Sequence, residues 1–191
     1  MTQSLCRLDD FKDNCGFGLI AHTKGKANHQ LLQNAIKALT CMTHRGGVAA
    51  DGKTGDGCGL LMQKPDSFLR SVVKESLQIE LPELYAVGAV MLNTDDHKRG
   101  EAKSILEQEL SAQGLHVLGW REVPTDNSCL GPIAIESLPA FEQVFIAPGD
   151  ISDEKHFGAR LYMGRRKAEK QLVDDNRFHI ASLGTNILSY K

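Results

Sequence analysis

A cysteine followed by glycines at alternate positions is the pattern in this sequence with the clearest potential for chemistry. It lies in Asp13–His22, DNCGFGLIAH, where Gly16 and Gly18 leave room beside the Cys15 thiol for a small substrate. A thiol becomes a nucleophile when a neighbouring base or positive charge favours the thiolate. The alternative for any single cysteine is a small buried side chain in a strand. A nucleophilic role for Cys15 therefore requires a base close to it.

The base with the simplest origin is the α-amino group of Cys15 itself. No histidine in the sequence is marked by its context as a partner for the thiol. An α-amino group has a pKa of about 7.7–8.0, so a useful fraction is unprotonated at neutral pH, whereas a peptide nitrogen is not basic. Cleavage of the Asn14–Cys15 bond would create that amine. Met1–Asn14 is polar, contains several aspartates and lacks the apolar region of a secretory signal, so we interpret it as a propeptide.

The glycine-rich segment 45–57, RGGVAADGKTGDG, contains a literal match to the phosphate-binding loop pattern GxxxxGK[ST] in residues 47–54. A phosphate-binding loop follows a strand and begins a helix. Here a helical pattern precedes the loop, and the glycines of GDGCG that follow Thr54 are a poor start for a helix. Asp51 and Asp56 would also repel a polyphosphate. We therefore reject nucleotide binding and expect a loop whose glycines allow positive φ or close backbone approach.

The composition is that of an ordinary globular domain. The chain has 191 residues, of which 41% are hydrophobic and 24% charged, and its formal net charge of −2 gives no reason to expect a nucleic acid or a membrane as a partner. The 5 cysteines form no CxxC pair and the 7 histidines no HxxxH pair, so we expect no metal site within the chain. Such cysteine usage is typical of a reducing compartment, and we expect a cytoplasmic protein.

Alternating strand and helix patterns predict a mixed α and β fold. A short strand is expected at 15–21, with Phe17, Leu19 and Ala21 on one face. Further strands are expected at residues 58–63, 84–93, 115–124, 141–148, 178–183 and 186–191. Helices are expected at residues 29–44, 65–77, 95–114 and 153–173. Asn28 and either Asp95 or Asp96 are expected as N-terminal caps, and Gly114 as a C-terminal cap.

The strand–helix–strand segment 84–123 could form a subdomain of its own, and its pattern alone also allows a ferredoxin-like unit. No repeat and no flexible linker divides the chain. The sequence ends at Lys191 inside an expected strand, without turn residues or a polar tail. We therefore expect a segment of a longer protein, with a short native terminus as the alternative.

Several of these motifs together resemble one family. DNCGFGLIAH, ALTCMTHRGG and ADGKTGDGCGLLMQKPDSFLR are similar to the beginning of the large subunit of glutamate synthases, a class II glutamine amidotransferase domain with an N-terminal nucleophile. YAVGAVML, VLGWREVPTD and RLYMGRRKAEK continue the likeness, which covers the chain from Asp13 onward. The Cys-Gly-x-Gly and His-Arg-Gly motifs recur through class II amidotransferases, whereas ADGKTGDGCG is particular to glutamate synthases.

The resemblance implies a fold and a reaction. The fold would be α+β, the first part of a four-layer αββα Ntn-hydrolase sandwich truncated at its C-terminus. Residues 1–14 would be a leader, and residues 15–191 an incomplete amidotransferase domain. Cys15 would attack the side-chain amide of glutamine, ammonia would leave, and water would hydrolyse the thioester to glutamate. The ammonia would then be channelled to 2-oxoglutarate, whose reduction yields a second glutamate.

Residue by residue, the resemblance assigns Cys15 as the nucleophile and Arg45 as the arginine near it. Arg45 would pair with a carboxylate such as Asp51 or Asp56, or favour the thiolate through its charge. A loop salt bridge without a catalytic part is the alternative. Gly46 would serve the loop geometry, and Asp51 and Asp56 would support the site. The family's oxyanion-hole Asn-Gly pair and its arginine for the glutamine carboxylate have no match here, so we expect both further along a full-length chain.

The resemblance implies no cofactor within this segment. In the family, FMN and a 3Fe–4S cluster belong to later parts of the large subunit, and electrons come from NADPH through a smaller subunit or from ferredoxin. The implied partners are glutamine, the rest of the large subunit and a small NADPH-oxidising subunit, in an oligomeric enzyme. Two alternatives stay open: another class II amidotransferase with a different ammonia acceptor, and a non-catalytic module in which Cys15 is a core residue.

Overall fold

The computed structural model describes residues 16–42, 46–55 and 57–190. Four residues that the sequence assigns to the site lie outside these ranges, namely Asn14, Cys15, Arg45 and Asp56. The described chain combines helices with antiparallel sheets, as the alternating pattern predicts.

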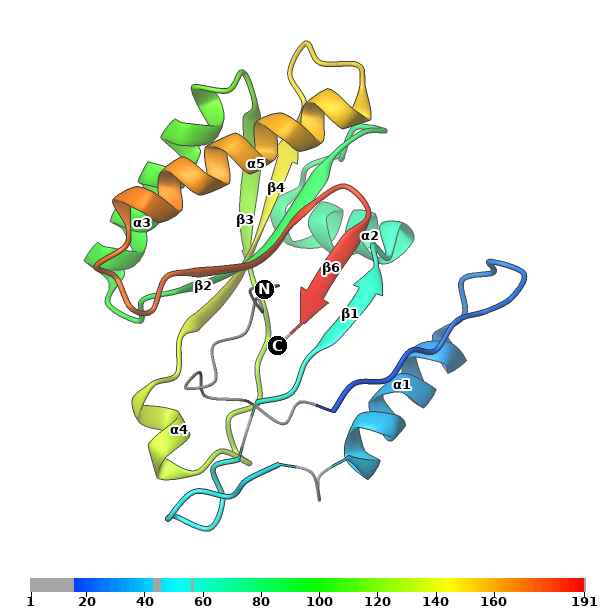
Figure 1. The fold of residues 1–191 in the computed structure, drawn as a ribbon. Helices are drawn as coiled ribbons and strands as arrows, with labels where there is room; N and C mark the ends of the chain where they lie inside the picture. Colours follow the sequence, from blue (N-terminus) through cyan, green and yellow to red (C-terminus); the bar gives the residue numbers. More distant parts are fainter. Residues whose placement is uncertain (1–15, 43–45, 56, 191) are drawn as a thin grey trace, which may run out of the picture.

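A four-stranded antiparallel sheet forms the centre of the structure (Figure 1). Across the sheet the strands are β3 (His116–Glu122), β4 (Ala140–Ala147), β2 (Ala86–Leu92) and β5 (His179–Gly184). Helix α3 (Asp96–Ser111) connects β2 to β3, and α5 (Glu154–Gln171) connects β4 to β5. Each helix thus joins two mutually parallel strands that are separated by a third, which is the arrangement of a ferredoxin-like unit.

The sequence pattern of 84–123 allowed a subdomain of its own or a ferredoxin-like unit, and the ferredoxin-like arrangement is present only over a longer range. Residues 84–123 supply only β2, α3 and β3, and β2 does not pair with β3. Strand β4 lies between them and hydrogen-bonds to both. The unit therefore closes only when β4, α5 and β5 are added, and it is not an insertion that ends near residue 123.

Helices α3 and α5 pack side by side against one face of this sheet (Figure 1). Their buried side chains are Ala102, Leu106, Leu110, Phe157, Leu161 and Ala168. Both helices begin at an aspartate cap, because Asp95 accepts a hydrogen bond from the Lys98 amide at 3.0 Å and Asp153 one from the His156 amide at 2.8 Å. Gly114 follows α3 with a φ of +77°, as its expected role at the helix end requires.

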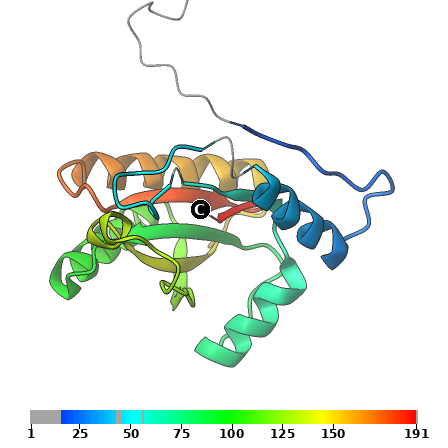
Figure 2. The same cartoon turned by 90° about the horizontal axis from the view of Figure 1, so that it is seen from below.

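The opposite face of the sheet is covered by α2 (Asp66–Leu77) and by a small sheet of β1 (Leu60–Gln63) and β6 (Ile187–Tyr190). Figure 2 shows α2 and α5 on opposite sides of the strands. The side chains buried in this second core are Leu69, Val73, Leu81, Tyr85, Val87, Phe145 and Leu188. Because neighbouring residues of a strand point to opposite faces, β2 contributes side chains to both cores.

A polar cluster fixes the start of α2 against the residue that precedes β2. The Tyr85 hydroxyl donates to Asp66 Oδ1 at 2.9 Å, and Arg70 Nε donates to Asp66 Oδ2 at 2.8 Å. Lys64 Nζ lies 3.7 Å from the centre of the Tyr85 ring. Burial would raise the pKa of Asp66, but the hydrogen bonds from Arg70 and Tyr85 outweigh it and the pKa is lowered. Burial and the neighbouring Asp66 raise the pKa of the Tyr85 hydroxyl.

The expected strand at 15–21 is wrong for the part that the structure describes. Residues 16–22 have no regular secondary structure. Phe17 is 93% exposed and Leu19 88%, so the face predicted to be buried lies in solvent. A strand needs a neighbour for its backbone groups, and no strand of the described ranges pairs with this segment. Weak alternation alone was therefore insufficient evidence for a strand.

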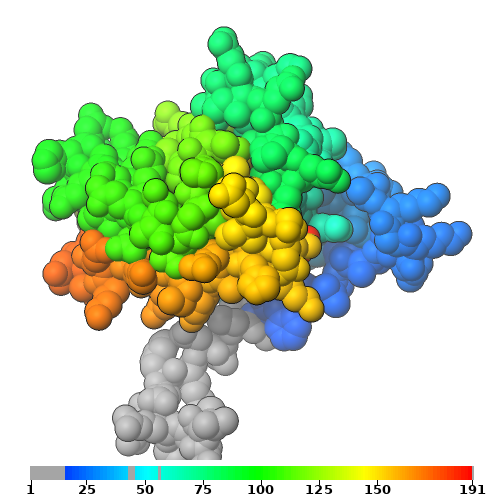
Figure 3. Space-filling view, turned by 90° about the horizontal axis from the view of Figure 1, so that it is seen from above, coloured from blue at the N-terminus to red at the C-terminus, as the bar shows by residue number. Residues whose placement is uncertain are grey.

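Helix α1 (His29–Cys41) begins where the sequence predicts, with the Asn28 side chain accepting a hydrogen bond from the Gln30 amide at 2.8 Å. None of its residues is fully buried, and Ile36 of the expected apolar stripe is exposed. Figure 3 shows the blue segment that contains α1 to one side of the main body of atoms. A short helix, α4 (Pro132–Glu136), lies between the strands expected at 115–124 and 141–148, where the sequence predicted no helix.

We expect opposite effects from two glycine-to-alanine substitutions. At Gly88 in β2, an added Cβ would lie 2.7 Å from Val144 Cγ1 and 2.9 Å from Leu183 Cδ1, so Gly88→Ala should lower the free energy of unfolding by about 1–3 kcal/mol. At Gly100 in α3 the added Cβ meets nothing within 4 Å, and Gly100→Ala should raise it by about 0.5–1 kcal/mol. Urea unfolding of both variants measures this. An unchanged or raised free energy of unfolding in Gly88→Ala would contradict the packing described for β2.

Removal of the Tyr85 hydroxyl should change how stability depends on pH. The folded state holds the pKa of Tyr85 above its unfolded value of about 10, so this group stabilises the fold below pH 10 and the contribution is lost as pH rises above that value. We expect Tyr85→Phe to cost about 0.5–1.5 kcal/mol at pH 7 and to reduce the alkaline loss of stability. Urea unfolding between pH 7 and pH 11 measures both, with Tyr162→Phe as the control because that side chain is 62% exposed. An unchanged alkaline slope in Tyr85→Phe would contradict the assignment.

Candidate active site

The site predicted from sequence lies around the start of the domain and the glycine-rich loop. Of its residues, Gly46 and Asp51 are described, and both belong to the segment 46–55, which we call the 46–55 loop. Gly18, three residues after Cys15, is exposed, and a Cβ added there would meet nothing within 4 Å. The space that the sequence expects next to this glycine is therefore open. The pairing of Arg45 with Asp51 or Asp56 stays a prediction, because two of these residues are outside the described ranges.

The 46–55 loop is a tight turn closed by its own backbone. Val48 and Gly55 form an antiparallel bridge, and the Ala49 amide donates to the Thr54 carbonyl at 2.7 Å. Gly52 has a φ of +69°, and its amide donates to the Ala49 carbonyl at 3.0 Å. Positive φ is the conformation for which glycine is suited, so the expected use of a loop glycine is confirmed.

The context of this loop is not that of a phosphate-binding loop. Helix α1 precedes it, and the described residues between it and β1 form no helix. The strand, loop and helix order that a phosphate-binding loop needs is thus missing on both sides. The rejection of nucleotide binding agrees with this geometry.

Asp51 fills the turn with its own carboxylate. Asp51 Oδ1 accepts hydrogen bonds from the Lys53 amide at 3.0 Å and the Thr54 amide at 2.7 Å. Asp51 Oδ2 accepts from the Thr54 hydroxyl at 2.5 Å. These bonds, first of all those from the Thr54 hydroxyl and amide, hold the pKa of Asp51 well below its usual range because they favour the charged form. Asp51 and Thr54 are half-buried, whereas Gly52 and Lys53 between them are exposed.

The same two side chains dock the loop onto the first turn of α4, far away in sequence. The Ile133 amide donates to Asp51 Oδ2 at 3.3 Å, and the Ala134 amide donates to Thr54 Oγ1 at 3.2 Å. Figure 1 shows the loop beside α4 at the end of the molecule opposite α2. The sequence marked Asp51 as a support of the site, but nothing in it indicated that α4 is the element it contacts.

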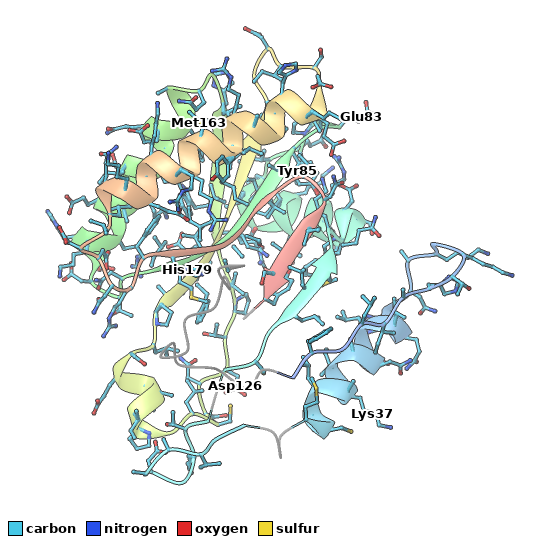
Figure 4. All side chains as sticks on the ribbon, viewed as in Figure 1. Lys37, Glu83, Tyr85, Asp126, Met163 and His179 are labelled. Atoms are coloured by element: carbon cyan, nitrogen blue, oxygen red, sulfur yellow. The ribbon has the colours of Figure 1, made fainter. Side chains whose placement is uncertain are left out.

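A second polar region lies at the other end of the structure. A pocket of about 350 Å³ is lined by Lys64, Asp66, Arg70, Glu83, Glu154 and Asn186, among others. Figure 4 shows Glu83 and Tyr85 at this end, and Asp126 and Lys37 at the end that holds the loop. Several charged groups of this pocket already have partners in the chain: Arg70 binds Asp66, Lys64 binds the Tyr85 carbonyl, and Glu154 Oε1 accepts from the side chains of Thr185 and Asn186 at 2.7 and 2.8 Å. Neither Gly46 nor Asp51 lines this pocket, so it is distinct from the described part of the site that the sequence predicts.

The described residues offer no set of ligands for a metal or an iron–sulfur cluster. Across 16–42, 46–55 and 57–190, no group of three or more His, Cys, Asp or Glu side chains could hold a metal ion. Cys41, Cys58 and Cys129 are free and exposed. An iron–sulfur cluster needs several cysteine thiolates together, so these residues do not fit one.

In the same ranges, no helix has the length and apolar character needed to cross a bilayer.

Comparison with known proteins identifies the family. The model for class II glutamine amidotransferases matches residues 15–191. The chain is 39% identical over 193 residues to the glutamate synthase [NADPH] large chain of Bacillus subtilis, covering 99% of this chain and 12% of that protein. It is 35% identical to the ferredoxin-dependent glutamate synthase of Pyropia yezoensis, with 100% of this chain and 12% of that protein covered. It is also 35% identical to the glutamate synthase [NADH] of Saccharomyces cerevisiae, a match that covers 94% of this chain and 9% of that protein.

The extent and the starting point of these matches both bear on the site. The chain spans 12%, 12% and 9% of the lengths of these three relatives. The family match begins at Cys15, the residue that the sequence assigns as nucleophile. The match also extends across the 46–55 loop and the ferredoxin-like unit to residue 191. This chain belongs to the class II glutamine amidotransferases.

Proposed function

We propose that this chain is the glutamine-hydrolysing part of a glutamate synthase. The observation that carries the proposal is a family match that begins at Cys15, joined to whole-chain similarity with relatives that are named glutamate synthases. The start of the match leaves Met1–Asn14 outside the domain, which supports their assignment as a propeptide. Cleavage before Cys15 would free the α-amino group that the thiol needs as its base.

The reaction proposed for Cys15 is nucleophilic acyl transfer. The α-amino group of Cys15 takes the thiol proton, and the sulfur forms a bond to the side-chain carbonyl carbon of glutamine. The C–N bond then breaks, the amine returns the proton to the leaving nitrogen, and ammonia departs from a thioester. Water hydrolyses the thioester to glutamate and restores the thiol. Arg45 stands beside the thiol in this proposal, with Gly46, Asp51 and Asp56 as supports of its loop.

The fold proposed for the complete domain is the four-layer αββα sandwich of Ntn hydrolases. The described part has apolar surfaces that a further layer would cover. Leu61 of β1 is 68% exposed and Ile187 of β6 51%, on the face of the small sheet that points away from the core. Helix α1 likewise has no fully buried residue. Additional strands and helices of the same domain, including the oxyanion hole and the arginine for the glutamine carboxylate, would complete these surfaces.

The rest of the enzyme would supply the second half of the reaction. FMN and a 3Fe–4S cluster would belong to other parts of the full-length chain, where 2-oxoglutarate is reduced to glutamate. The relatives are named for NADPH, NADH or ferredoxin, so similarity alone does not select the electron donor. We propose the NADPH form, with a small NADPH-oxidising subunit, in a cytoplasmic oligomer. A different class II amidotransferase is disfavoured, since relatives across these organisms carry the glutamate synthase name.

Labelling by a glutamine analogue tests the nucleophile. In the full-length protein, N-terminal sequencing should find Cys15 as the first residue, and a diazo-ketone analogue of glutamine should alkylate Cys15 alone. Cys15→Ala should lower glutamine-dependent glutamate formation by at least about 10³-fold, because the covalent step is lost. Formation of glutamate from added ammonia should persist, which shows that the rest of the enzyme is intact.

Cys129→Ala is the matched control, because Cys129 is a free exposed thiol that the reaction does not use. An active enzyme with residues 1–14 still attached would contradict the proposed role of the Cys15 amine. Alkylation of a different cysteine would favour a non-catalytic Cys15.

The 191-residue chain on its own should show negligible glutaminase activity. The expected oxyanion-hole pair and the carboxylate-binding arginine have no match in its sequence. Loss of even one oxyanion donor costs about 10²–10³ in rate. Ammonia release from glutamine, compared between this chain and the full-length protein at equal concentration, measures the difference. Release at a similar rate would overturn the expected placement of these residues.

A further inference from the structure

The contact between the 46–55 loop and α4 is built from a small number of complementary groups. Asp51 Oδ2 and Thr54 Oγ1 each accept one amide of the first turn of α4, across a sequence separation of about 80 residues. Thr54 also donates its hydroxyl proton to Asp51, so this single side chain both donates and accepts. The two amide donors of α4 are therefore matched by two acceptor oxygens of the loop, Asp51 Oδ2 and Thr54 Oγ1.

Gly131 makes the approach of the loop possible. A Cβ at this position would lie 2.4 Å from Asp51 Oδ2, 2.5 Å from Thr54 Oγ1 and 2.8 Å from the Thr54 nitrogen. The backbone of Gly131, with φ −78° and ψ 159°, is one that any residue adopts. Glycine is thus required here for space and not for conformation. We call Asp51, Thr54 and Gly131 the latch.

The far side of α4 is held by the ferredoxin-like unit. Arg177, which precedes β5, donates to the Glu136 carbonyl at 2.7 Å and to the Leu138 carbonyl at 3.1 Å. Its guanidinium also donates to Thr94 Oγ1 at 3.1 Å, next to the end of β2. A continuous set of hydrogen bonds therefore connects the central sheet to α4, and α4 to the loop.

The hydrogen bonds of Asp51 leave its carboxylate no spare capacity for a substrate. A carboxylate has about four lone-pair sites for hydrogen bonds. The Asp51 carboxylate accepts four hydrogen bonds, from the backbone amides of Lys53, Thr54 and Ile133 and from the hydroxyl of Thr54. Binding the ammonium or amide of glutamine would require this carboxylate to give up a bond within the latch.

We propose that the latch is a positioning device for glutamine hydrolysis: it holds the 46–55 loop, which the family motifs assign to the site, in a defined place against α4 and, through Arg177, against the central sheet. Asp51 is on this view a positioning residue and not a ligand of glutamine. The inference rests on the proposed function for its catalytic consequence. The latch contact itself rests only on the geometry of the described residues.

A pair of substitutions at Thr54 tests the contact directly. Thr54→Val keeps the shape of the side chain but removes the hydroxyl, whereas Thr54→Ser keeps the hydroxyl. In amide hydrogen exchange of the full-length protein, Thr54→Val should speed exchange of the Ala134 amide by about two- to tenfold, and Thr54→Ser should leave it near the wild-type rate. Gly131→Ala should speed it as well, because the added Cβ displaces the loop. Unchanged exchange in both Thr54→Val and Gly131→Ala would overturn the latch.

Kinetics in the same protein test the positioning role. Thr54→Val and Gly131→Ala should each lower kcat for glutamine hydrolysis by about 10- to 100-fold with a smaller change in KM, as a misplaced group near the reacting atoms does. The double variant should be no slower than the slower single variant, because one contact is lost in each case. Thr54→Ser should stay within about twofold of wild type, and ammonia-dependent glutamate formation should be unchanged in all variants.

The outcomes separate the two proposals. If Asp51→Asn raised KM for glutamine while Thr54→Val and Gly131→Ala left kcat unchanged, Asp51 would be a substrate ligand and the positioning role would be overturned. An absence of glutaminase activity in the wild-type full-length protein would overturn the proposed function and with it the catalytic role of the latch. The exchange rates would still decide whether the latch exists.

Discussion

The structure depends on one strand that is buried on both faces. In β2, Ala86, Val90 and Leu92 point toward α3 and α5, while Val87 points toward α2 and the small β1–β6 sheet. Gly88 lies in the middle of β2, where an added side chain would collide with Val144 and Leu183 of the neighbouring strands. Burial of two apolar faces by one strand is favourable in proportion to the area removed from water, and it leaves no freedom of register, because a one-residue shift would exchange the two faces. The two layers of the described fold are thereby fixed relative to each other.

That fixed centre extends outward through directed hydrogen bonds. At the end of β2, Asn93 contacts Asp175 through its side-chain amide at 3.3 Å, and Asp175 in turn accepts the Arg177 amide at 3.1 Å. Arg177 then binds the carbonyls at the end of α4, whose first turn binds Asp51 and Thr54. Apolar packing is non-directional and could tolerate sliding of a short helix, whereas charged and backbone hydrogen bonds require defined positions. The position of an otherwise exposed loop is in this way determined by the central sheet.

The sequence predicted the parts of the fold whose signals are local. The caps at Asn28 and Asp95, the turn glycine Gly114 and most strands and helices depend on residues within a few positions of one another, and they were confirmed. Helix α4 was missed because five residues, Pro132–Glu136, are too few to show a helical period. The strand expected at 15–21 was wrong because strand formation requires a partner, and alternation in one segment does not reveal one.

In the candidate site, too, the sequence revealed what depends on local motifs and missed what depends on contacts between distant segments. Sequence motifs marked Cys15, Arg45, Gly46, Asp51 and Asp56; the family match spans all of them, and the roles of these residues stay predictions. The contact between Asp51 and α4 could not be predicted, since it joins segments about 80 residues apart. Gly131 carried no signal either, because its backbone angles are ordinary and only the approach of the loop excludes a side chain.

The latch also gives a structural use to a phosphate-loop pattern whose context is not that of a phosphate-binding loop. The pattern GxxxxGK[ST] describes a backbone turn whose amides at the lysine and threonine gather around an anion. In this loop the amides of Lys53 and Thr54 do gather around an anion, but the anion is the carboxylate of Asp51. The chain supplies the negative charge from within, and the threonine hydroxyl, which would meet a metal ion in a nucleotide site, instead joins Asp51 to α4. The same local chemistry thus serves to fasten a loop, and the aspartate inside the pattern is the residue that distinguishes the two uses.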